Sequence, residues 1–414
     1  MDDDLGELIQ TDILVENGKI KKIGEHISAS SGIQKIDGSN HIVMPGLMDN
    51  HWHTWTSLLK SMSGNSKKEA YFKVTEEYGK LYQPETMYLA TKFALAEAIH
   101  SGITTINDFN HNARNAEFVW ASFEAIKEMG LKGRVSYGYY RDLKSEEPTP
   151  FSEIENVLQQ KKSQEGYEDI KLGFGSRAVG YPYLKKDWEQ ARALNMPIAI
   201  HASSTPKDKN QIQQLSKWQL LGNDVNIIHA NAITDEEITA VKNSGASITM
   251  TPYSEMRIGF GFPQVNRLVN QDIRLGVGVD STALSGSSNL LNTLKLLENV
   301  ANAQAMSEFG VASHRLLKMA TIDAAKILGI SDQTGSITEG KQADLIMINR
   351  DHINLSSGNK LEKLVIEAAQ NFNIDFVASK GKILKQNGEL TQIDEGELKN
   401  EVNNTFGKMT KRLN

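Results

Sequence analysis

Four histidines and one aspartate of this 414-residue chain stand at the ends of apolar runs, where strands would deliver them to a common site. His51 and His53 are two residues apart in PGLMDNHWHTW, so a strand there points both imidazoles to the same face. His201 ends the run PIAIH, His229 ends VNIIH, and Asp280 ends LGVGVD. A lone histidine in such a place is more often a core residue, but its repetition after successive runs favours a functional set. Three histidines and an aspartate suit a borderline divalent ion such as zinc and leave one position open for water.

The chemistry expected of such a site is hydrolysis by metal-activated water. A bound divalent ion lowers the pKa of its water from about 15.7 to about 7, which provides hydroxide at neutral pH. Asp280, beside that water, can accept its proton and later pass it to the leaving group. The carbon attacked is electron-poor, either the C–NH2 carbon of a ring or the C=O carbon of an amide.

Only a closed barrel brings these residues together, because the successive gaps between them, starting at His53, are 148, 28 and 51 residues long. Apolar strand-like runs recur roughly every 30 residues, each followed by a polar helix-like stretch, which is the length of one strand–helix–strand unit. The runs begin near Val43, Gly102, Gly133, Ile170, Pro197, Val225, Ala246 and Arg274. Eight such units in a row favour a (β/α)8 TIM barrel over an open doubly wound sheet. The candidate residues then lie at the C-terminal ends of the strands, where active sites of such barrels are found.

The two flanks of the barrel predict a second, smaller domain. DILVENGKIKKI contains two short strands around an Asn-Gly turn, which is a strong hairpin signal. QADLIMIN and DFVASKGKIL, near the other end of the chain, are also strand-like. We therefore expect an α/β protein in which residues 1–44 and 335–390 form a small composite β-sandwich domain. Residues 45–334 are expected to form the barrel, and residues 391–414 a helical tail.

Composition excludes several classes of protein. The formal charge is −6, and no long basic run points to nucleic acid or an anionic membrane as the partner. No apolar stretch approaches the roughly 18–20 residues that span a bilayer, and the acidic start MDDDLGELIQ is unlike a secretory signal. The absence of cysteine excludes thiol nucleophiles, disulfides and cysteine-bound metals. We expect a cytoplasmic protein with a small-molecule substrate.

Ordered motifs along nearly the whole chain resemble the amidohydrolase superfamily, in the branch of cytosine and guanine deaminases and s-triazine hydrolases. The motifs are DILVENGKIKKIG, PGLMDNHWH, AEAIHSGITTINDF, LGVGVDS and MATIDAAKILGI followed by GSITEGKQADLIMI. Carried over position by position, the resemblance implies the metal ligands His51, His53, His201 and Asp280. It implies that His229 contacts the metal-bound water or the oxygen developing on the substrate. One divalent ion is expected, with zinc favoured over iron or manganese, and a homodimer is an expectation from the resemblance alone.

The chain departs from this branch at the position where its deaminases usually carry a glutamate that protonates the ring nitrogen. Here that position, three residues after His201, is Ser204, which has no useful acidity near pH 7. Glu255, in TPYSEMRIGFG, is the best substitute in the sequence, because it follows the seventh predicted strand. Arg257 next to it is a candidate for binding an anionic or carbonyl group. The alternative is that Glu255 and Arg257 form a solvated surface pair.

Further side chains are candidates for lining the mouth of the barrel. His111 follows the second predicted strand and could reach the pocket, although a polar loop position is the alternative. Trp55 and other aromatic residues suggest a flat substrate, a weak indication because such mouths are usually apolar. Lys171 stands at the beginning of its strand, so a carboxylated lysine bridging two metals is not expected.

Two classes of function follow from these residues. The first is a metal hydrolase of C–N bonds other than peptide bonds, with deamination of an N-heterocycle slightly preferred. Hydrolysis of a cyclic or other amide is the close alternative because of Ser204, and displacement of chloride from a triazine-like ring is a third variant. The second class is a non-catalytic scaffold.

Family members usually carry an edge strand before MDDDLGE, so Met1 is expected to be an internal methionine or to follow a trimmed segment.

Overall fold

A nearly closed ring of eight parallel strands forms the centre of the computed structural model, which describes residues 6–28 and 31–413. Each strand pairs with the next along the chain. The strands are β4 (Leu47–Trp52), β5 (Ile103–Phe109), β6 (Lys132–Ser136), β7 (Ile170–Gly175), β8 (Ile198–Ala202), β9 (Val225–His229), β10 (Ser247–Met250) and β11 (Arg274–Val277). A bridge between Trp52 and Asp280 brings the first strand to the last. The (β/α)8 barrel predicted from the spacing is confirmed.

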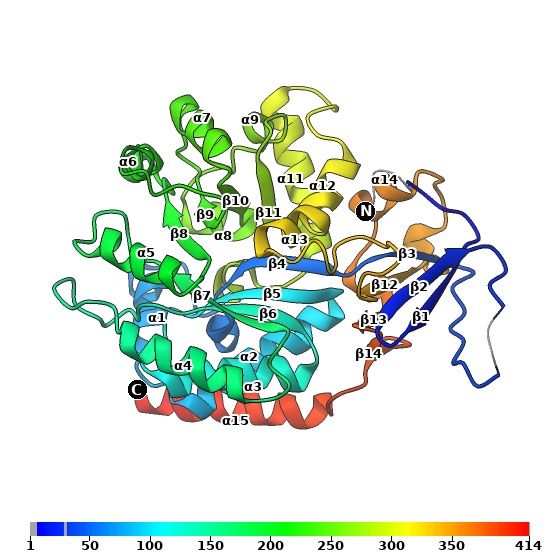
Figure 1. Cartoon of the computed structure of the whole chain (residues 1–414), viewed down its shortest axis with the longest axis horizontal. Coiled ribbons are helices and arrows are strands. Elements are labelled where there is room, and N and C mark those ends of the chain that lie inside the picture. The colour runs from blue at the N-terminus through cyan, green and yellow to red at the C-terminus, as the bar shows by residue number, and fades with distance from the viewer. Residues whose placement is uncertain (1–5, 29–30, 414) are drawn as a thin grey trace.

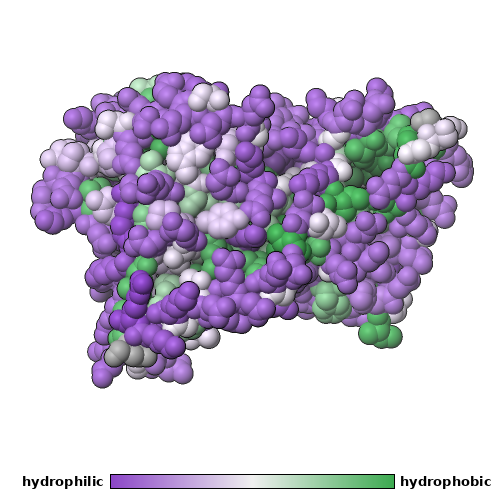
Figure 2. Space-filling model, turned by 90° about the horizontal axis from the view of Figure 1, so that it is seen from below, coloured by the Kyte–Doolittle hydropathy of each residue, from purple (hydrophilic) through white to green (hydrophobic). Residues whose placement is uncertain are grey.

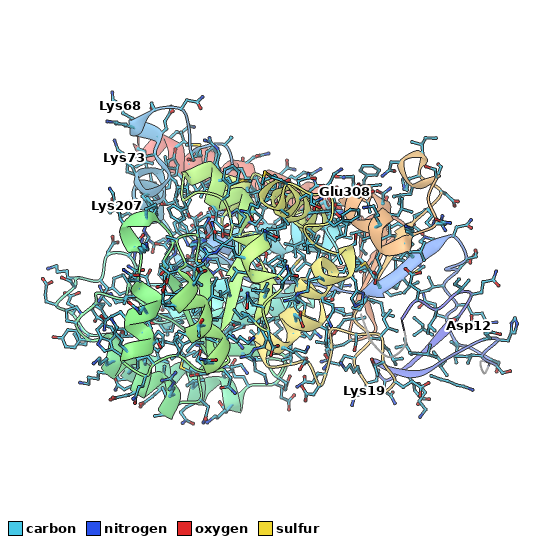
Figure 3. All side chains as sticks on the ribbon, turned by 90° about the horizontal axis from the view of Figure 1, so that it is seen from above. Asp12, Lys19, Lys68, Lys73, Lys207 and Glu308 are labelled. Carbon is cyan, nitrogen blue, oxygen red and sulfur yellow. The ribbon has the colours of Figure 1, made fainter. Side chains whose placement is uncertain are left out.

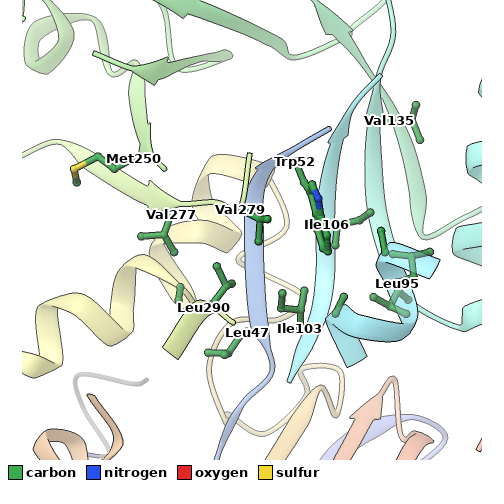
Figure 4. Packing of buried hydrophobic residues seen from close by; sticks show 14 of the residues in the cluster. Leu47, Trp52, Leu95, Ile103, Ile106, Val135, Met250, Val277, Val279 and Leu290 are labelled. Carbon is green, nitrogen blue, oxygen red and sulfur yellow. The ribbon is translucent and has the colours of Figure 1, made fainter. Parts of the chain in front are cut away.

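Helices cover the outside of this barrel (Figure 1). Those that follow the strands are α2 (Pro84–His100), α3 (Ala116–Met129), α4 (Phe151–Ser163), α5 (Leu184–Ala193), α6 (Gln211–Lys217), α7 (Asp235–Ser244), α8 (Pro252–Ile258), α9 (Val265–Leu268), α10 (Thr282–Ser285), α11 (Leu290–Ala305), α12 (Ser313–Met319) and α13 (Ile322–Leu328). Their apolar faces pack on the barrel, where Figure 4 shows Ile106 of β5, Val277 of β11 and Leu290 of α11 in one buried cluster. Local signals begin and end these helices. Asn115 caps α3, and Gly130 ends it with a left-handed φ of 74°.

A small antiparallel domain is built from both ends of the chain, as the flanking patterns predicted. Its five-stranded sheet has the order β15 (Glu389–Leu390), β14 (Lys382–Gln386), β13 (Ile374–Ser379), β12 (Leu345–Asn349) and β3 (His41–Pro45). A two-stranded sheet of β1 (Asp12–Glu16) and β2 (Lys19–Gly24) lies beside it, joined by the predicted Asn17-Gly18 turn. The hairpin is tied to the C-terminal half of the chain by hydrogen bonds from Ile20 N to the carbonyl of Lys341 and from Ala343 N to that of Gly18.

The first predicted run is two strands and not one. β3 ends at Pro45 in the small sheet, and β4 begins at Leu47 in the barrel. Gly46 lies between them, and a Cβ there would come within 2.3 Å of Thr104 Oγ1. The chain therefore needs glycine where it passes from one sheet to the other, directly before the strand that carries His51.

The middle of the barrel interior is polar, which the apolar runs did not predict. Asn107 Nδ2 donates to the carbonyl of Asn50 over 2.9 Å, and Ser136 Oγ donates to Asn107 Oδ1 over 2.8 Å. On the other side, Thr249 Oγ1 donates to Asn226 Oδ1 over 2.9 Å. These buried side chains form a layer of hydrogen bonds inside the barrel, and buried networks of this kind make the surrounding structure rigid.

The remaining segments complete the outside. Short helices follow β4, namely η1 (Thr54–Leu59), η2 (Lys67–Glu69) and α1 (Tyr71–Gly79), and others are η3 (Pro206–Asp208), η4 (Ile353–Leu355), α14 (Leu361–Glu367) and η5 (Asn371–Asn373). The expected tail helix, α15 (Glu395–Leu413), runs along α2 and α1 and is red in Figure 1. The face seen from that side is mostly hydrophilic (Figure 2). Within the described ranges no helix has the length and apolarity needed to cross a membrane. The expectation for Met1 falls on residues outside the described part of the chain.

Candidate metal centre

Three histidines and an aspartate converge at the C-terminal ends of β4, β8 and β11. We call His51, His53, His201 and Asp280 the ligand group; one donor atom from each lies within 4.8 Å of all the others. His51 Nε2 and His53 Nε2 lie 3.2 and 3.3 Å from Asp280 Oδ1. His201 Nε2 lies 3.1 Å from His51 Nε2. In a tetrahedral site with bonds of about 2.0–2.1 Å, neighbouring donors are about 3.3–3.4 Å apart, so the four donors fit one divalent ion.

The pairing of the first and last strands of the barrel sets this geometry. His53 N donates to the carbonyl of Asp280, and Asp280 N donates to that of His51. We call this junction between β4 and the segment after β11 the seam. The buried carboxylate of Asp49 also bridges the seam, accepting from His51 N and from Val279 N, each over 2.9 Å. The hydrogen bonds of the seam therefore position three of the four ligand side chains, those of His51, His53 and Asp280.

The backbone at two of the strand ends is strained. Asp280 has a φ of 61° and His229 a φ of 74°, both in the left-handed region. Aspartate and histidine tolerate this region better than most residues, but each position still costs on the order of 1 kcal/mol. Such strain is kept where surrounding structure demands it, and here it turns both side chains into the mouth of the barrel.

Burial and hydrogen bonds set the protonation of His51, His201 and Asp280. Burial lowers the pKa of His51 to about 3 and holds that of His201 well below its usual value. Burial alone would raise the pKa of Asp280, but hydrogen bonds with His51 and His53 hold it well below the usual value. His51 and His201 are thus neutral and Asp280 is ionised, which are the forms that bind metal. His53 is further oriented by a 2.7 Å hydrogen bond from Nδ1 to the carbonyl of Phe109.

His229 lies beside the ligand group and outside it, with its ring centre 5.3 Å from that of His201. Its Nδ1 lies 3.3 Å from Glu255 Oε1 and 3.1 Å from Thr251 Oγ1. Glu255 is fully buried and also accepts from Thr251 N over 2.7 Å. The sequence indicated that Glu255 would face the mouth; its carboxylate instead lies on the Nδ1 side of His229. The alternative surface pair with Arg257 is wrong, because Glu255 is buried and the exposed Arg257 donates to the carbonyl of Ser63.

His111 reaches the ligand group. Its ring is stacked on that of His53, with centres 4.0 Å apart and planes 11° apart. Trp55 is fully buried, and its Nε1 donates to His111 Nδ1 over 3.1 Å. Trp55 therefore supports His111 from behind and exposes no aromatic face to the mouth. Ser204 is buried just after β8, and Lys171 is exposed near the start of β7, at the opposite end of the barrel.

The sequence did not single out Tyr71 and Arg141, which come from segments without regular patterns. Tyr71 is buried in α1; burial and the nearby Asp280 charge raise the pKa of its hydroxyl. Arg141 N donates to the carbonyl of His111, and its guanidinium donates to Thr75 Oγ1 and to the carbonyl of Phe72. Arg141 thereby ties α1 to the loop after β6. The ligand group lies at the end of the barrel away from the small domain: Lys68, Lys73 and Lys207, which follow the C-terminal ends of β4 and β8, are at the opposite end of Figure 3 from Asp12 and Lys19.

A (β/α)8 barrel that gathers such a group at its strand ends defines a metal-dependent hydrolase. The chain belongs to the amidohydrolase family, whose family model matches residues 42–384. It is 27% identical over 415 residues to a 5'-deoxyadenosine deaminase of Methanobrevibacter smithii, covering 94% of this chain and 92% of that protein. It is also 27% identical to a 5-methylthioadenosine/S-adenosylhomocysteine deaminase of Pyrococcus furiosus, covering 94% of each.

Solved structures share the fold at lower identity. A zinc-bound adenosine deaminase from Xanthomonas campestris superposes with a TM-score of 0.87 at 20% identity, covering 98% of this chain and 94% of that one. The zinc complex of atrazine chlorohydrolase TrzN from Arthrobacter aurescens superposes with a TM-score of 0.85 at 21% identity, covering 98% and 97%. The chain is therefore a hydrolase of carbon–nitrogen bonds by family, on the fold that its sequence predicted.

Proposed function

We propose that this protein is an aminohydrolase that uses one divalent ion, zinc first, to remove an amino group from an N-heterocycle. The convergence of the four donors of the ligand group within 4.8 Å carries the proposal. Deaminases of 5'-deoxyadenosine and of methylthioadenosine among the relatives support an aminopurine nucleoside as the first substrate class to test. A homodimer and a cytoplasmic location stay predictions from the sequence.

The residues of the chain divide the work. The ligand group would hold the ion, which would supply water with a pKa near neutral pH. Asp280, kept ionised, accepts the proton of that water at its carboxylate and delivers it to the leaving amine. With both ring nitrogens protonated, His229 donates from Nδ1 to Glu255 and from Nε2 to the substrate oxygen on which negative charge develops. We assign Glu255 a positioning role, because its carboxylate orients His229 and lies away from the ligand group.

Amide hydrolysis is the second candidate, favoured by Ser204 at the position of the deaminase glutamate. A cyclic amide already carries an electron-poor carbonyl carbon, so its hydrolysis does not need a ring nitrogen to be protonated first. Ammonia release distinguishes the two candidates, because a ring-opened amide retains its nitrogen. Chloride release from a chlorotriazine tests the third variant.

The deciding experiment measures metal content and ammonia release on the same preparation. Mass spectrometry of the purified protein is expected to give about one zinc per chain, and the loaded protein is expected to release ammonia from 5'-deoxyadenosine or methylthioadenosine. The double variant His51→Ala/His53→Ala should lose both the metal and the activity. A matched double variant, His26→Ala/His352→Ala, removes two histidines of the small domain and should lose neither.

Three results would count against the proposal. Full metal content and activity in His51→Ala/His53→Ala would mean that the site is wrongly assigned. No metal in the wild type, even after incubation with zinc, iron and manganese, would favour the scaffold interpretation. Hydrolysis of a cyclic amide without ammonia release would select the second candidate.

A further inference from the structure

The hydrogen bond between Trp55 and His111 determines which nitrogen of His111 carries a proton, because an indole N–H can only donate. Trp55 Nε1 donates to His111 Nδ1 over 3.1 Å. A nitrogen that accepts a hydrogen bond carries no proton of its own, so the proton of this imidazole is on Nε2. Protonation of both nitrogens would place two donors against each other. The contact therefore selects one tautomer of His111 and keeps the ring neutral.

The surroundings hold this ring in place. Trp55 is itself locked in a buried pocket, where its ring meets that of Tyr82 edge-on, with centres 5.5 Å apart. Tyr82 Oη donates to the backbone carbonyl of Trp55 over 2.6 Å. On one face, His111 stacks on His53. The backbone carbonyl of His111 accepts from Arg141 N over 3.1 Å. Neither the ring plane nor the backbone is free to turn.

The remaining nitrogen of His111 is available to a ligand. Among residues 6–28 and 31–413 no protein atom makes a hydrogen bond with His111 Nε2. His111 is only partly buried, whereas Trp55 behind it is fully buried. The neighbouring ring, that of His53, belongs to the ligand group. The ring that carries this N–H donor thus lies directly against a member of the ligand group.

We propose that the Trp55–His111 pair supplies a fixed neutral N–H donor to the substrate, taking over the ring contact that position 204 does not provide. This inference rests on the proposed function and specifies the substrate further. The substrate must present an acceptor next to the carbon attacked, such as the unprotonated ring nitrogen of an aminopurine. A ring that presents an N–H at that position is rejected, because two donors would then meet among buried side chains.

The donor gives a hydrogen bond and no proton. Loss of the Nε2 proton would leave an imidazolate, and the indole of Trp55 has no proton to replace it at neutral pH. The proton that the leaving amine gains therefore comes from Asp280, as in the proposed mechanism, and the balance is unchanged. The role of His111 is to hold the ring nitrogen and stabilise the electron density that moves onto it during attack.

The first test reads the tautomer and needs no turnover. In the zinc-loaded, full-length protein labelled with 15N-histidine, the chemical shifts of His111 are expected to show a protonated Nε2 and an unprotonated Nδ1. The His111→Gln variant assigns the signals. Trp55→Phe keeps the aromatic bulk and removes the N–H, so the shifts should move toward a mixture of tautomers. Trp120→Phe is the matched control, because Trp120 Nε1 donates to Gln160 on the outside of the barrel. A protonated Nδ1 in the wild type overturns the proposal.

The second test reads the donor in the kinetics. His111→Phe keeps a flat ring without a donor and is expected to lower kcat/KM for an aminopurine nucleoside by about 10–100-fold. His111→Gln retains an N–H donor and should recover part of that loss, and both variants should keep one metal per chain. Equal losses in the two variants would overturn the donor role. If the wild type holds its metal but releases no ammonia from any amine, the proposed function fails. The tautomer measurement still tests whether Trp55 fixes the proton of His111 on Nε2.

Discussion

Replacing Asp49 by asparagine tests whether the seam between β4 and β11 holds the metal centre together. The carboxylate is fully buried, and its two oxygens accept from His51 N and Val279 N, each over 2.9 Å. An asparagine side chain at this position would offer a single oxygen, and its amide nitrogen would face the other backbone N–H. A hydrogen bond is lost and a buried donor is left without a partner, at a cost of about 1–3 kcal/mol.

The expected result has two parts. In urea denaturation of the metal-free protein, Asp49→Asn should lower the stability by the amount given above. In titration against a chelator, metal affinity should fall about 10–100-fold, because the seam orients His51 and Asp280 without touching the ion. Asp12→Asn is the matched control. Asp12 accepts from Ile27 N over 2.9 Å on the exposed hairpin, so its change should stay within about 0.5 kcal/mol. Wild-type stability together with wild-type metal affinity in Asp49→Asn would refute the reasoning.

Three further predictions address other parts of the molecule. Glu255→Gln removes the charge beside His229 Nδ1. In steady-state assays of the zinc-loaded protein, this variant is expected to lower kcat about 10–100-fold with little change in KM. A change in KM alone would contradict the positioning role of Glu255. His51 has a pKa of about 3, below the value of about 6.5 in an unfolded chain, so the unfolded state takes up its proton first as the pH falls. Stability of the metal-free protein should therefore decline between about pH 6.5 and pH 3, by up to about 1.4 kcal/mol per pH unit for this group, and His51→Gln should show a shallower decline in urea titrations at several pH values. Lys132→Met breaks the buried ion pair with Asp344 that joins the barrel to the small domain, and should lower the free energy of unfolding by about 3–5 kcal/mol. Metal content, measured by mass spectrometry, should stay unchanged, because the pair lies at the opposite end of the barrel from the metal centre.

The spacing of apolar runs was sufficient to predict the barrel. Parallel strands connected by helices need about 30 residues per unit, and this period is visible without any contact being known. The ends of those runs also indicated which side chains meet, because the C-terminal ends of the strands in one barrel face the same mouth. The prediction missed the break at Gly46, since the steric demand there comes from Thr104, a residue 58 positions further along the chain.

Side-chain direction at the mouth was beyond the reach of the pattern. Glu255 and Arg257 are two residues apart in one short helix, yet one is buried against His229 and the other is exposed. Which of them faces inward depends on how α8 packs against α10 and α11. Trp55 was expected to line the mouth, and its hydrogen bond to His111 spans 56 residues of sequence. No local rule of spacing reports a contact of that kind.

The sequence by itself determined the class of fold and the residue types at the strand ends, because periodicity and the alternation of side chains along a strand are local properties. The resemblance already implied which histidines share a centre and which one lies beside it, but only the tertiary structure decided how the donor atoms converge and which partners orient each ring. His201 joins the ligand group, whereas His229, at the end of the next strand, turns its Nδ1 to Glu255. The physical reason is that donor atoms must converge to within a few ångströms. That convergence depends on barrel closure, on the left-handed backbone at His229 and Asp280, and on partners supplied by distant segments.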